Sequence, residues 1–415
     1  MEKRLLLFLL LSFVILQLTM TYTGKKYGTG RQEQATTEQA RTGADQRSTT
    51  ATQTLAPAES RPAGLSAAQA SPESYPIGPT VPVRTRVYDI LFSTNGGVPV
   101  RWDIIDPRFV THAVDAATSG TAREHLIDPQ LAEHPELPRP FQTVLQELNA
   151  RYYNEFNQMV FTHEQLDRAG PIHRFTSPPN AAGLQMVKTW TFQQDSFQAR
   201  LTIELINQGQ SNINFGGGER GLGVMIGPGL GGVSNVRNEP VSTYASVDAV
   251  LNASGGFLYE HIGKLGSGGG NTTRGQTITL ERTRGLGEVL WGGIESKYFL
   301  AALMPDKTNP ITGAEALLDN RVLGTLTDSE KLVGDFPMIE LYGSPFKLQA
   351  GQSVQFGYSL FVGPKQRQLL EAAGHDLSRA MFHYSSGLIR ALCNLLMTIL
   401  YWLHCVLGIW GAAII

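Results

Sequence analysis

The chain has 415 residues, and its 34 basic and 36 acidic side chains give a net charge of −2 at pH 7. This balance shows no basic footprint for nucleic acid, so we expect no nucleic-acid partner. Hydrophobic residues make up 42% of the chain and glycine contributes 44 residues, a composition that suits a globular β-rich protein better than a transporter with many spans.

The amino-terminal end has the pattern of a targeting segment. A short basic start precedes an almost unbroken apolar run at residues 5–20, as in signal sequences. No Ala-x-Ala cleavage site follows the run. We therefore predict an uncleaved signal-anchor transmembrane helix within residues 1–23, with the amino terminus in the cytoplasm. Basic residues just after the run weaken this orientation signal.

Residues 24–80 differ sharply in composition from the rest. They consist mainly of Thr, Gln, Ala, Ser, Gly and Pro, and their only aromatic residues are Tyr27 and Tyr75. So little apolar surface cannot offset the entropy lost on ordering. We predict a disordered tether, which as a coil of roughly 57 residues would span on the order of 40 Å.

Residues 81–364 show the alternation typical of β-strands. Apolar and polar residues alternate at residues 197–205 and again at 354–360, which indicates strands with one buried face. Asn95-Gly96-Gly97 separates two apolar runs, residues 87–93 and 98–104, and predicts a hairpin. The sequence therefore predicts one large antiparallel β domain of two stacked sheets.

One segment of this region has a helical period instead. Phe141, Val144, Leu145 and Leu148 would share one face of a helix. We therefore predict a helix after Pro140.

Several motifs resemble catalytic or binding signals. Residues 227–232 satisfy G-x-G-x-x-G, but residues 233–240 do not continue as a helix, so a glycine-rich turn is favoured over a dinucleotide site. The glycine cluster at 266–270 predicts a loop. Glu260-His261 is the one adjacent acid–base pair worth testing, and the histidines lack metal-ligand spacing. We predict no catalytic residue, no cofactor and no metal.

The two cysteines, Cys393 and Cys405, both lie near the carboxyl end. On a helix they would be about 18 Å apart along the axis, too far for a disulfide. Cysteine usage therefore predicts no disulfide framework.

The carboxyl end is predicted to be helical and membrane-associated. We expect a helical connector at residues 365–384, an amphipathic interfacial helix at 385–408 and the start of a second span at 409–415. The membrane-facing side of the interfacial helix would comprise Leu388, Leu392, Leu395, Leu396, Ile399, Trp402, Leu403 and Val406. A polar stripe would comprise Arg390, Asn394, Tyr401 and His404.

Two alternatives bear on this end of the chain. The helix at 385–408 could instead be a polar-striped span packed in a bundle. The apolar run after residue 409 stops without a polar flank, so we expect the chain to be the front part of a longer membrane protein.

Six short motifs occur in the same order as in one known family. They are residues 92–97 (FSTNGG), 187–192 (VKTWTF) with 195–197 (DSF), 226–231 (IGPGLG), 291–299 (WGGIESKYF), 360–365 (LFVGPK) and 402–411 (WLHCVLGIWG). In this order, and with the anchor and tether before them, they resemble the bacterial membrane-protein insertase family YidC.

The resemblance implies a fold and a role. The fold would be mainly β: a large antiparallel β-supersandwich in the periplasm, related to galactose mutarotases, with an N-terminal transmembrane helix and a C-terminal amphipathic helix. The role would be that of an insertase and chaperone of the bacterial inner membrane, and not of an enzyme. Its partners would be nascent inner-membrane proteins, Sec translocon components and the lipid bilayer. The family's groove-forming spans lie beyond these residues, so no groove residue is assigned.

Two other functions remain open from the residues alone. The β domain could be an exported carbohydrate-binding or sugar-epimerase-like domain, for which Glu260-His261 would be tested first. It could also be a membrane-anchored scaffold that binds partners through its β surface.

Overall fold

The computed structural model describes residues 74–110, 124–127, 134–135, 137–147, 154–167, 171–216, 220–230, 248–254, 256–260, 276–280, 288–327, 330–381 and 387–407. The predicted signal anchor, the tether up to residue 73 and the predicted second span lie outside these ranges. All of the described residues lie within one compact unit, residues 62–415.

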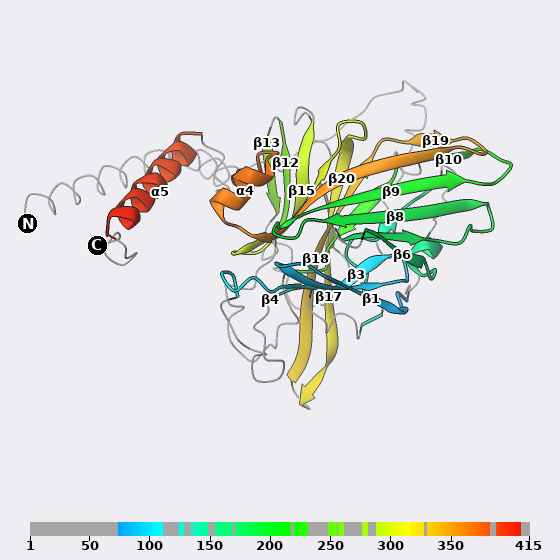
Figure 1. Ribbon diagram of the computed structural model, residues 1–415, viewed down its shortest axis with the longest axis horizontal. Coiled ribbons are helices and arrows are strands. Elements are labelled where there is room, and N and C mark those ends of the chain that lie inside the picture. The colour runs from blue at the N-terminus through cyan, green and yellow to red at the C-terminus, as the bar shows by residue number, and fades with distance from the viewer. Residues whose placement is uncertain are drawn as a thin grey trace, which may run out of the picture. The chain divides into compact units, whose positions relative to one another are not determined.

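A nine-stranded antiparallel sheet is the largest element (Figure 1). Its strands follow in the order β13 (Gly256–Glu260), β12 (Asp248–Ala253), β15 (Val289–Glu295), β16 (Phe299–Pro305), β20 (Ser353–Pro364), β9 (Gln198–Asn207), β8 (Leu184–Phe192), β7 (Ile172–Thr176) and β6 (Thr162–Asp167). The strands β8, β9 and β20 lie side by side although β20 is far from the other two in sequence.

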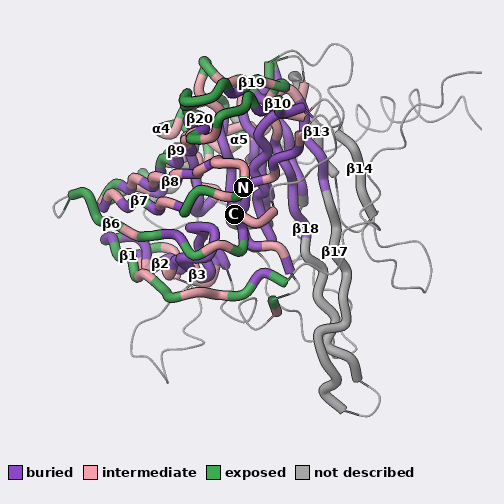
Figure 2. The backbone as a smooth tube through the Cα atoms, turned by 90° about the vertical axis from the view of Figure 1, so that its right-hand side faces the viewer, coloured by how far each residue is buried: buried purple, intermediate pink, exposed green. Residues whose placement is uncertain are grey.

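The alternation predicted for residues 197–205 is confirmed in β9. Buried and partly exposed residues alternate along β9 and also along its neighbour β8, as the colours of Figure 2 show. In β20 the alternation covers only the start of the strand, and most residues from Phe356 onward are buried. A run of buried residues of this kind is typical of a strand that is covered on both faces.

A five-stranded antiparallel sheet packs against the nine-stranded one. Its order is β14 (Gln276–Leu280), β17 (Ile311–Thr327), β18 (Glu330–Gly343), β11 (Gly223–Ile226) and β5 (Thr143–Val144). Strand β18 contacts β12 and β15 of the larger sheet. A Cβ atom on Gly292 would lie 2.7 Å from Cδ2 of Leu341 in β18, so this glycine permits the close approach of the sheets. The predicted stacking of antiparallel sheets is confirmed.

Two smaller sheets complete the β domain. The first contains β1 (Thr80–Arg84), β2 (Tyr88–Ser93), β3 (Val98–Ile104) and β4 (Glu124–Ile127), and the second pairs β10 (Ile213–Phe215) with β19 (Phe346–Leu348). The hairpin predicted at Asn95 is confirmed between β2 and β3. Gly96 and Gly97 there have φ of 71° and 60°, which glycine adopts without steric cost.

Buried aromatic side chains join the four-stranded sheet to the nine-stranded one. The ring of Phe92 in β2 lies 5.1 Å from that of Trp190 in β8, and Trp102 in β3 lies 6.4 Å from Trp190. Trp190 also donates a hydrogen bond from Nε1 to the carbonyl of Gly97, at 3.1 Å. Edge-to-face pairs of this kind add about 0.5–1.5 kcal/mol beyond burial, so this cluster ties the first hairpin to the main sheet.

The helix predicted after Pro140 is wrong. Phe141 has φ of 61°, and Thr143–Val144 form the strand β5, which pairs with β11. The side chain of Asn157, in the 3-10 helix η3 (Asn154–Asn157), bonds both the N–H and the carbonyl of Thr143, at 3.2 and 2.8 Å. These long-range hydrogen bonds satisfy backbone groups that a helix would have paired locally. The helical spacing of the apolar residues in this segment therefore reflects their burial and not a helix.

In the part of the chain that the structure describes, three helical elements follow the last strand. They are α4 (Arg367–Ala373), the 3-10 helix η5 (Leu377–Met381) and α5 (Gly387–Leu407).

Candidate functional site

The helix α5 carries a row of exposed apolar side chains. Its 21 residues include no proline and no glycine after Gly387, so nothing interrupts its backbone hydrogen bonds. The large exposed apolar residues are Leu392, Leu395, Leu396, Ile399 and Trp402, with Trp402 65% exposed. Intervals of three and four residues place them in one stripe along the helix. We call these five residues the α5 apolar row.

The remaining residues predicted for this site also lie in α5. Leu403 is half-buried. The side chains of Leu388 and Val406, and those of the polar stripe (Arg390, Asn394, Tyr401 and His404), lie outside the described part of the helix. The assignment of one helix face to the membrane interface stays a prediction.

Within the ranges that the structure describes, no helix combines the length and apolar character that a membrane crossing requires.

The segment between β20 and α5 is folded with a tight turn. The elements α4 and η5 bury Leu370, Leu377 and Ala380. Between them Gly374, His375 and Asp376 have positive φ, at 75°, 52° and 58°. Glycine adopts this conformation freely, but in His and Asp it costs about 1 kcal/mol or more each. Tertiary contacts must therefore hold this turn in place.

Asn252 in β12 supplies two of those contacts. Its fully buried amide donates from Nδ2 to Asp376 Oδ2 at 3.3 Å and accepts at Oδ1 from Arg379 Nη1 at 3.2 Å. Trp291 in β15 donates from Nε1 to the carbonyl of Asp376 at 3.4 Å. We call Asn252, Trp291, Asp376 and Arg379 the connector clasp, because they fasten the connector to two strands of the main sheet.

A buried carboxylate–imidazole pair lies in the four-stranded sheet. Asp103 Oδ1 lies 2.7 Å from His125 Nδ1, and Asp103 Oδ2 lies 3.2 Å from Arg101 Nε. The side chain of Asp103 is fully buried. Two partners satisfy this carboxylate, and such pairing is a structural requirement for a buried charge.

Two histidines form a second pair on the edge hairpin β6–β7. His163 Nε2 lies 3.0 Å from His173 Nδ1, and the rings are stacked with an angle of 18°. Burial, together with the charge of His163, lowers the pKa of His173 to about 4. Among the described residues, no group of three or more His, Cys, Asp or Glu side chains could hold a metal.

Lys188 in β8 is a fully buried cation. Its Nζ lies 3.4 Å from the carbonyl oxygen of Phe141, the residue with left-handed backbone. Burial lowers the pKa of Lys188 to about 7. The motif at residues 187–192 lies in β8, and the buried face of this strand includes the lysine between Met186 and Trp190.

Two carboxylates share one arginine in the five-stranded sheet. Glu315 in β17 and Glu340 in β18 are paired in register and buried, and Arg220 Nη1 lies 2.5 Å from Glu315 and 3.4 Å from Glu340. Burial raises the pKa of Glu340 to about 7; Arg220 opposes the rise and Glu315 adds to it. The guanidinium of Arg220 also lies over the ring of Tyr342, 4.6 Å from its centre.

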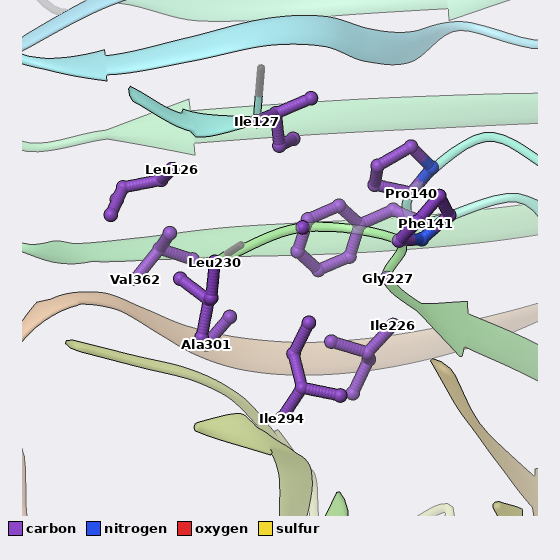
Figure 3. Close-up of a pocket in the computed structure, with 12 residues that line it drawn as sticks. Leu126, Ile127, Pro140, Phe141, Ile226, Gly227, Leu230, Ile294, Ala301 and Val362 are labelled. Atoms are coloured by element: carbon purple, nitrogen blue, oxygen red, sulfur yellow. The ribbon is translucent and has the colours of Figure 1, made fainter. Parts of the chain in front are cut away.

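A small cavity lies where the turn after β11 meets the main sheet (Figure 3). Its volume is about 10 Å³, and the side chains of Phe141, Ile226, Leu230 and Ile294 line it. No titratable side chain is among its lining residues. A site of this size holds at most about one water molecule, so this cavity cannot bind a sugar.

The glycine motif and the acid–base pair can be placed only in part. Residues 227–230 form the turn that ends β11, with a cis Gly227–Pro228 bond, which confirms a turn over those residues. Residues 231–232, the cluster at 266–270 and His261 lie outside the described ranges. Glu260 ends β13, but its side chain is not among those described. Cys393 and Cys405 are free thiols.

One family model matches the chain. It is described as the YidC periplasmic domain and matches residues 233–383. The match includes the strands β12 to β20 and the connector elements α4 and η5.

Two curated relatives are similar to parts of the chain. A "Membrane protein insertase YidC" of Syntrophus aciditrophicus (strain SB) is 33% identical over 124 residues, which cover 30% of this chain and 20% of that protein. One of Geotalea daltonii (strain DSM 22248 / JCM 15807 / FRC-32) is 23% identical over 219 residues, which cover 51% of this chain and 33% of that protein. The chain thus matches a fifth to a third of the length of these relatives.

Solved structures with a similar course of the chain include two sugar-related proteins. A putative aldose 1-epimerase of Escherichia coli K12 has a TM-score of 0.38 and 10% identity, and the match covers 69% of this chain and 99% of that one. A galactose mutarotase-like protein of Clostridium acetobutylicum has a TM-score of 0.37 and 10% identity, with coverage of 69% and 95%.

The residues of the connector clasp were not predicted from the sequence. Asn252 is the one amide side chain in the buried strand β12, and a buried polar residue in an apolar run was an available signal. Its partners Asp376 and Arg379 are more than 120 positions away, so no local pattern connects them.

Proposed function

This chain belongs to the YidC family, and from that premise we propose that it acts as part of a membrane protein insertase. It assists the insertion, folding and assembly of inner-membrane proteins, alone or beside the Sec translocon. Its partners are nascent inner-membrane proteins, Sec components and the lipid bilayer. The match of residues 233–383 to the YidC periplasmic domain supports this proposal.

The α5 apolar row is the observation that carries the proposal at the level of residues. Five large apolar side chains of one helix stripe are exposed, and burying each in an apolar layer would contribute about 1.5–3 kcal/mol. An amphipathic helix in the bilayer interface buries such a stripe, and Trp402 suits the headgroup level. We place α5 in the plane of the membrane on these grounds.

The location follows from the same arrangement. We propose that residues 1–23 anchor the chain in the bacterial inner membrane and that residues 24–80 act as a tether. The β domain then stands in the periplasm, a second span starts at residue 409, and the complete protein is multi-pass. We also keep the predicted boundaries of the β domain (81–364), the connector (365–384) and the interfacial helix (385–408) as proposals.

The proposed role is not catalytic. Asp103 is paired with Arg101 and His125, Glu315 and Glu340 share Arg220, and the cavity of Figure 3 is lined by apolar groups. Assistance of insertion requires a surface and a position at the membrane, which a tethered domain with an interfacial helix provides. We assign no catalytic residue and no cofactor.

Depletion and rescue test the proposal. The native gene is depleted and rescued by a copy carrying Leu395→Glu and Ile399→Glu. Two carboxylates in the apolar row oppose burial of α5 in the interface, so we expect the variant to accumulate but to fail in rescue, with membrane proteins left uninserted.

Asn394→Glu is the matched control, because Asn394 lies beside Leu395 in sequence and on the predicted polar stripe. This control should rescue fully. Full rescue by the double variant would contradict the interfacial role of α5.

A further inference from the structure

A three-residue turn of the β domain exposes an aromatic residue beside a lysine. Residues 296–298 join β15 to β16. Tyr298 is 54% exposed, and Lys297 Nζ lies over its ring, 5.4 Å from the centre. We call Lys297 and Tyr298 the turn tip.

The turn tip stands apart from the other exposed apolar residues of the β domain. Among the described residues of that domain, the other large exposed apolar side chains are Val160 and Leu166, which lie next to or within β6. β6 is the last strand of the nine-stranded sheet, whereas β15 and β16 lie toward its other end. Tyr298 is therefore an isolated feature of one end of the sheet.

The turn is held rigidly. Within it, Ser296 exchanges hydrogen bonds with Phe299: Ser296 N donates to the Phe299 carbonyl at 2.9 Å, and Phe299 N donates to Ser296 Oγ at 3.1 Å. Lys365, which is far along the chain, also holds the turn, because its backbone N–H donates a hydrogen bond to the carbonyl of Tyr298 at 2.7 Å. The buried Nζ of Lys365 also lies 3.0 Å from Glu295 Oε2 and 3.4 Å from the Ser296 carbonyl. A rigid turn presents its side chains with little loss of backbone entropy on binding.

Lys365 also marks where the chain leaves the β domain. It follows Pro364, the last residue of β20, and precedes the connector that leads through α4 and η5 to α5. The contacts of Lys365 thus place the turn tip at the exit of the chain toward the proposed interfacial helix. This is the end of the domain that the connector brings nearest to the bilayer, if α5 lies in it.

The chemistry of the turn tip fits one kind of surface. Tyrosine is enriched at headgroup level because its ring is apolar and its hydroxyl is polar. A lysine beside it attracts anionic headgroups and keeps its charge in water. Lys365 and Glu295 neutralise each other, as do Arg367 and Glu371 on α4, so no unpaired carboxylate of these groups repels an anionic surface.

We propose that the turn tip is a second membrane contact of this protein, which rests on the headgroup layer of a bilayer containing anionic lipid. This inference depends on the proposed function, because it assumes that α5 lies in the same membrane. The β domain is then held at the bilayer by α5 and by Lys297 and Tyr298, so its orientation to the membrane is set by more than one attachment.

Fluorescence of a label on the full chain tests this contact. In a background with Cys393→Ser and Cys405→Ser, single cysteines are introduced by Tyr298→Cys, Leu166→Cys and Ile399→Cys and labelled with a polarity-sensitive nitrobenzoxadiazole group. The chain is reconstituted into vesicles of phosphatidylethanolamine and phosphatidylglycerol. We expect emission from position 298 to shift to shorter wavelength and to be quenched by headgroup-labelled lipid, while position 166 remains as in water.

Charge variants make the test specific. Lys297→Glu should abolish the shift at position 298 in anionic vesicles, Lys297→Arg should preserve it, and neutral phosphatidylcholine vesicles should reduce it. The vesicles contain no other protein, so a shift there cannot come from a protein partner. If position 298 behaves like position 166, the turn tip does not contact lipid and the inference is overturned.

The label on α5 separates the two proposals. A water-like position 298 together with a lipid-embedded position 399 overturns the inference and leaves the interfacial helix intact. A water-like position 399 overturns the interfacial helix itself.

Discussion

Among the described residues, Lys188 has one hydrogen-bond acceptor, the carbonyl of Phe141, although its ammonium can donate three hydrogen bonds. Its cross-strand neighbours are Phe175 in β7 and Ile203 in β9, and burial of its charge is opposed by desolvation. Its charged form is therefore less stable in the folded chain than in the unfolded one.

The pH dependence of stability follows from this difference. The folded pKa of Lys188 is about 7 and the unfolded one is 10.5, so between these values the unfolded chain binds more protons. The contribution of Lys188 to the free energy of unfolding therefore rises as pH increases from 7 to 10.5. Below pH 7 this contribution is constant and at its lowest. We expect Lys188→Met to remove this rise and to stabilise the protein at pH 7.

Urea midpoints of the full chain in mild detergent, measured from pH 7 to 10, check the Lys188 prediction. Lys347→Met, at an exposed position of β19, is the matched control and should leave the slope unchanged. An unchanged slope in Lys188→Met would show that Lys188 does not carry the effect.

Glu340 changes stability with pH in the direction opposite to that of Lys188. Its folded pKa is about 7 against an ordinary value of 4.5, so the folded state binds more protons between pH 4.5 and 7. Stability from this site is present below pH 4.5 and falls as pH rises to 7. We expect Glu340→Gln, which keeps the shape and the neutral state, to flatten this fall.

Thermal unfolding between pH 4.5 and 8 measures the effect of Glu340→Gln. Glu164→Gln on the exposed edge strand β6 serves as control, since its side chain is 63% exposed. A slope in Glu340→Gln equal to that of the control would rule out Glu340 as the titrating group.

At the scale of elements, the connector depends on contacts that its own residues cannot make. The left-handed His375 and Asp376 are unfavourable locally, and Asn252 and Trp291 hold the turn from two strands of the main sheet. We expect Asn252→Ala to destabilise the connector by about 1–3 kcal/mol, because Asp376 and Arg379 lose buried partners.

Hydrogen exchange resolved by segment checks the clasp. Protection at residues 374–381 should fall in Asn252→Ala, while protection of β8 and β9 stays as in the parent chain. Asn309→Ala, which removes a surface hydrogen bond to Gln355, is the control and should leave residues 374–381 protected. Equal exchange in both variants would mean that the clasp does not hold the connector.

Some of these elements could be predicted from the sequence and others could not. The alternation of β9 and the glycines of the β2–β3 hairpin were predictable, because both depend on neighbouring residues. The helix predicted near Phe141 failed, because Asn157 and β11 supply partners for the backbone of Thr143. The α5 helix lies within the range predicted to be helical, whereas the membrane contact of its apolar face stays a prediction.

At the scale of the whole molecule, the proposed topology places the β domain in the periplasm and the amino terminus in the cytoplasm. With Cys393→Ser and Cys405→Ser as background, Val160→Cys puts a thiol at a 57% exposed position of the β domain. We expect an impermeant maleimide to label this thiol in intact spheroplasts.

Glu2→Cys is the counterpart at the amino terminus and should react only after the membrane is permeabilised. Labelling of position 2 and protection of position 160 in intact spheroplasts would reverse the proposed orientation.

The amino-acid sequence by itself determined the mainly β character of the fold, the helical period near the carboxyl end and the family resemblance, since all three are carried by local periodicity and by short ordered motifs. Only the tertiary structure decided that Lys188 and Glu340 are buried, that Asn252 fastens the connector, and that Lys365 holds the turn at Tyr298. The reason is that burial and hydrogen bonding between residues far apart in sequence depend on which strands become neighbours, and no local pattern specifies that order.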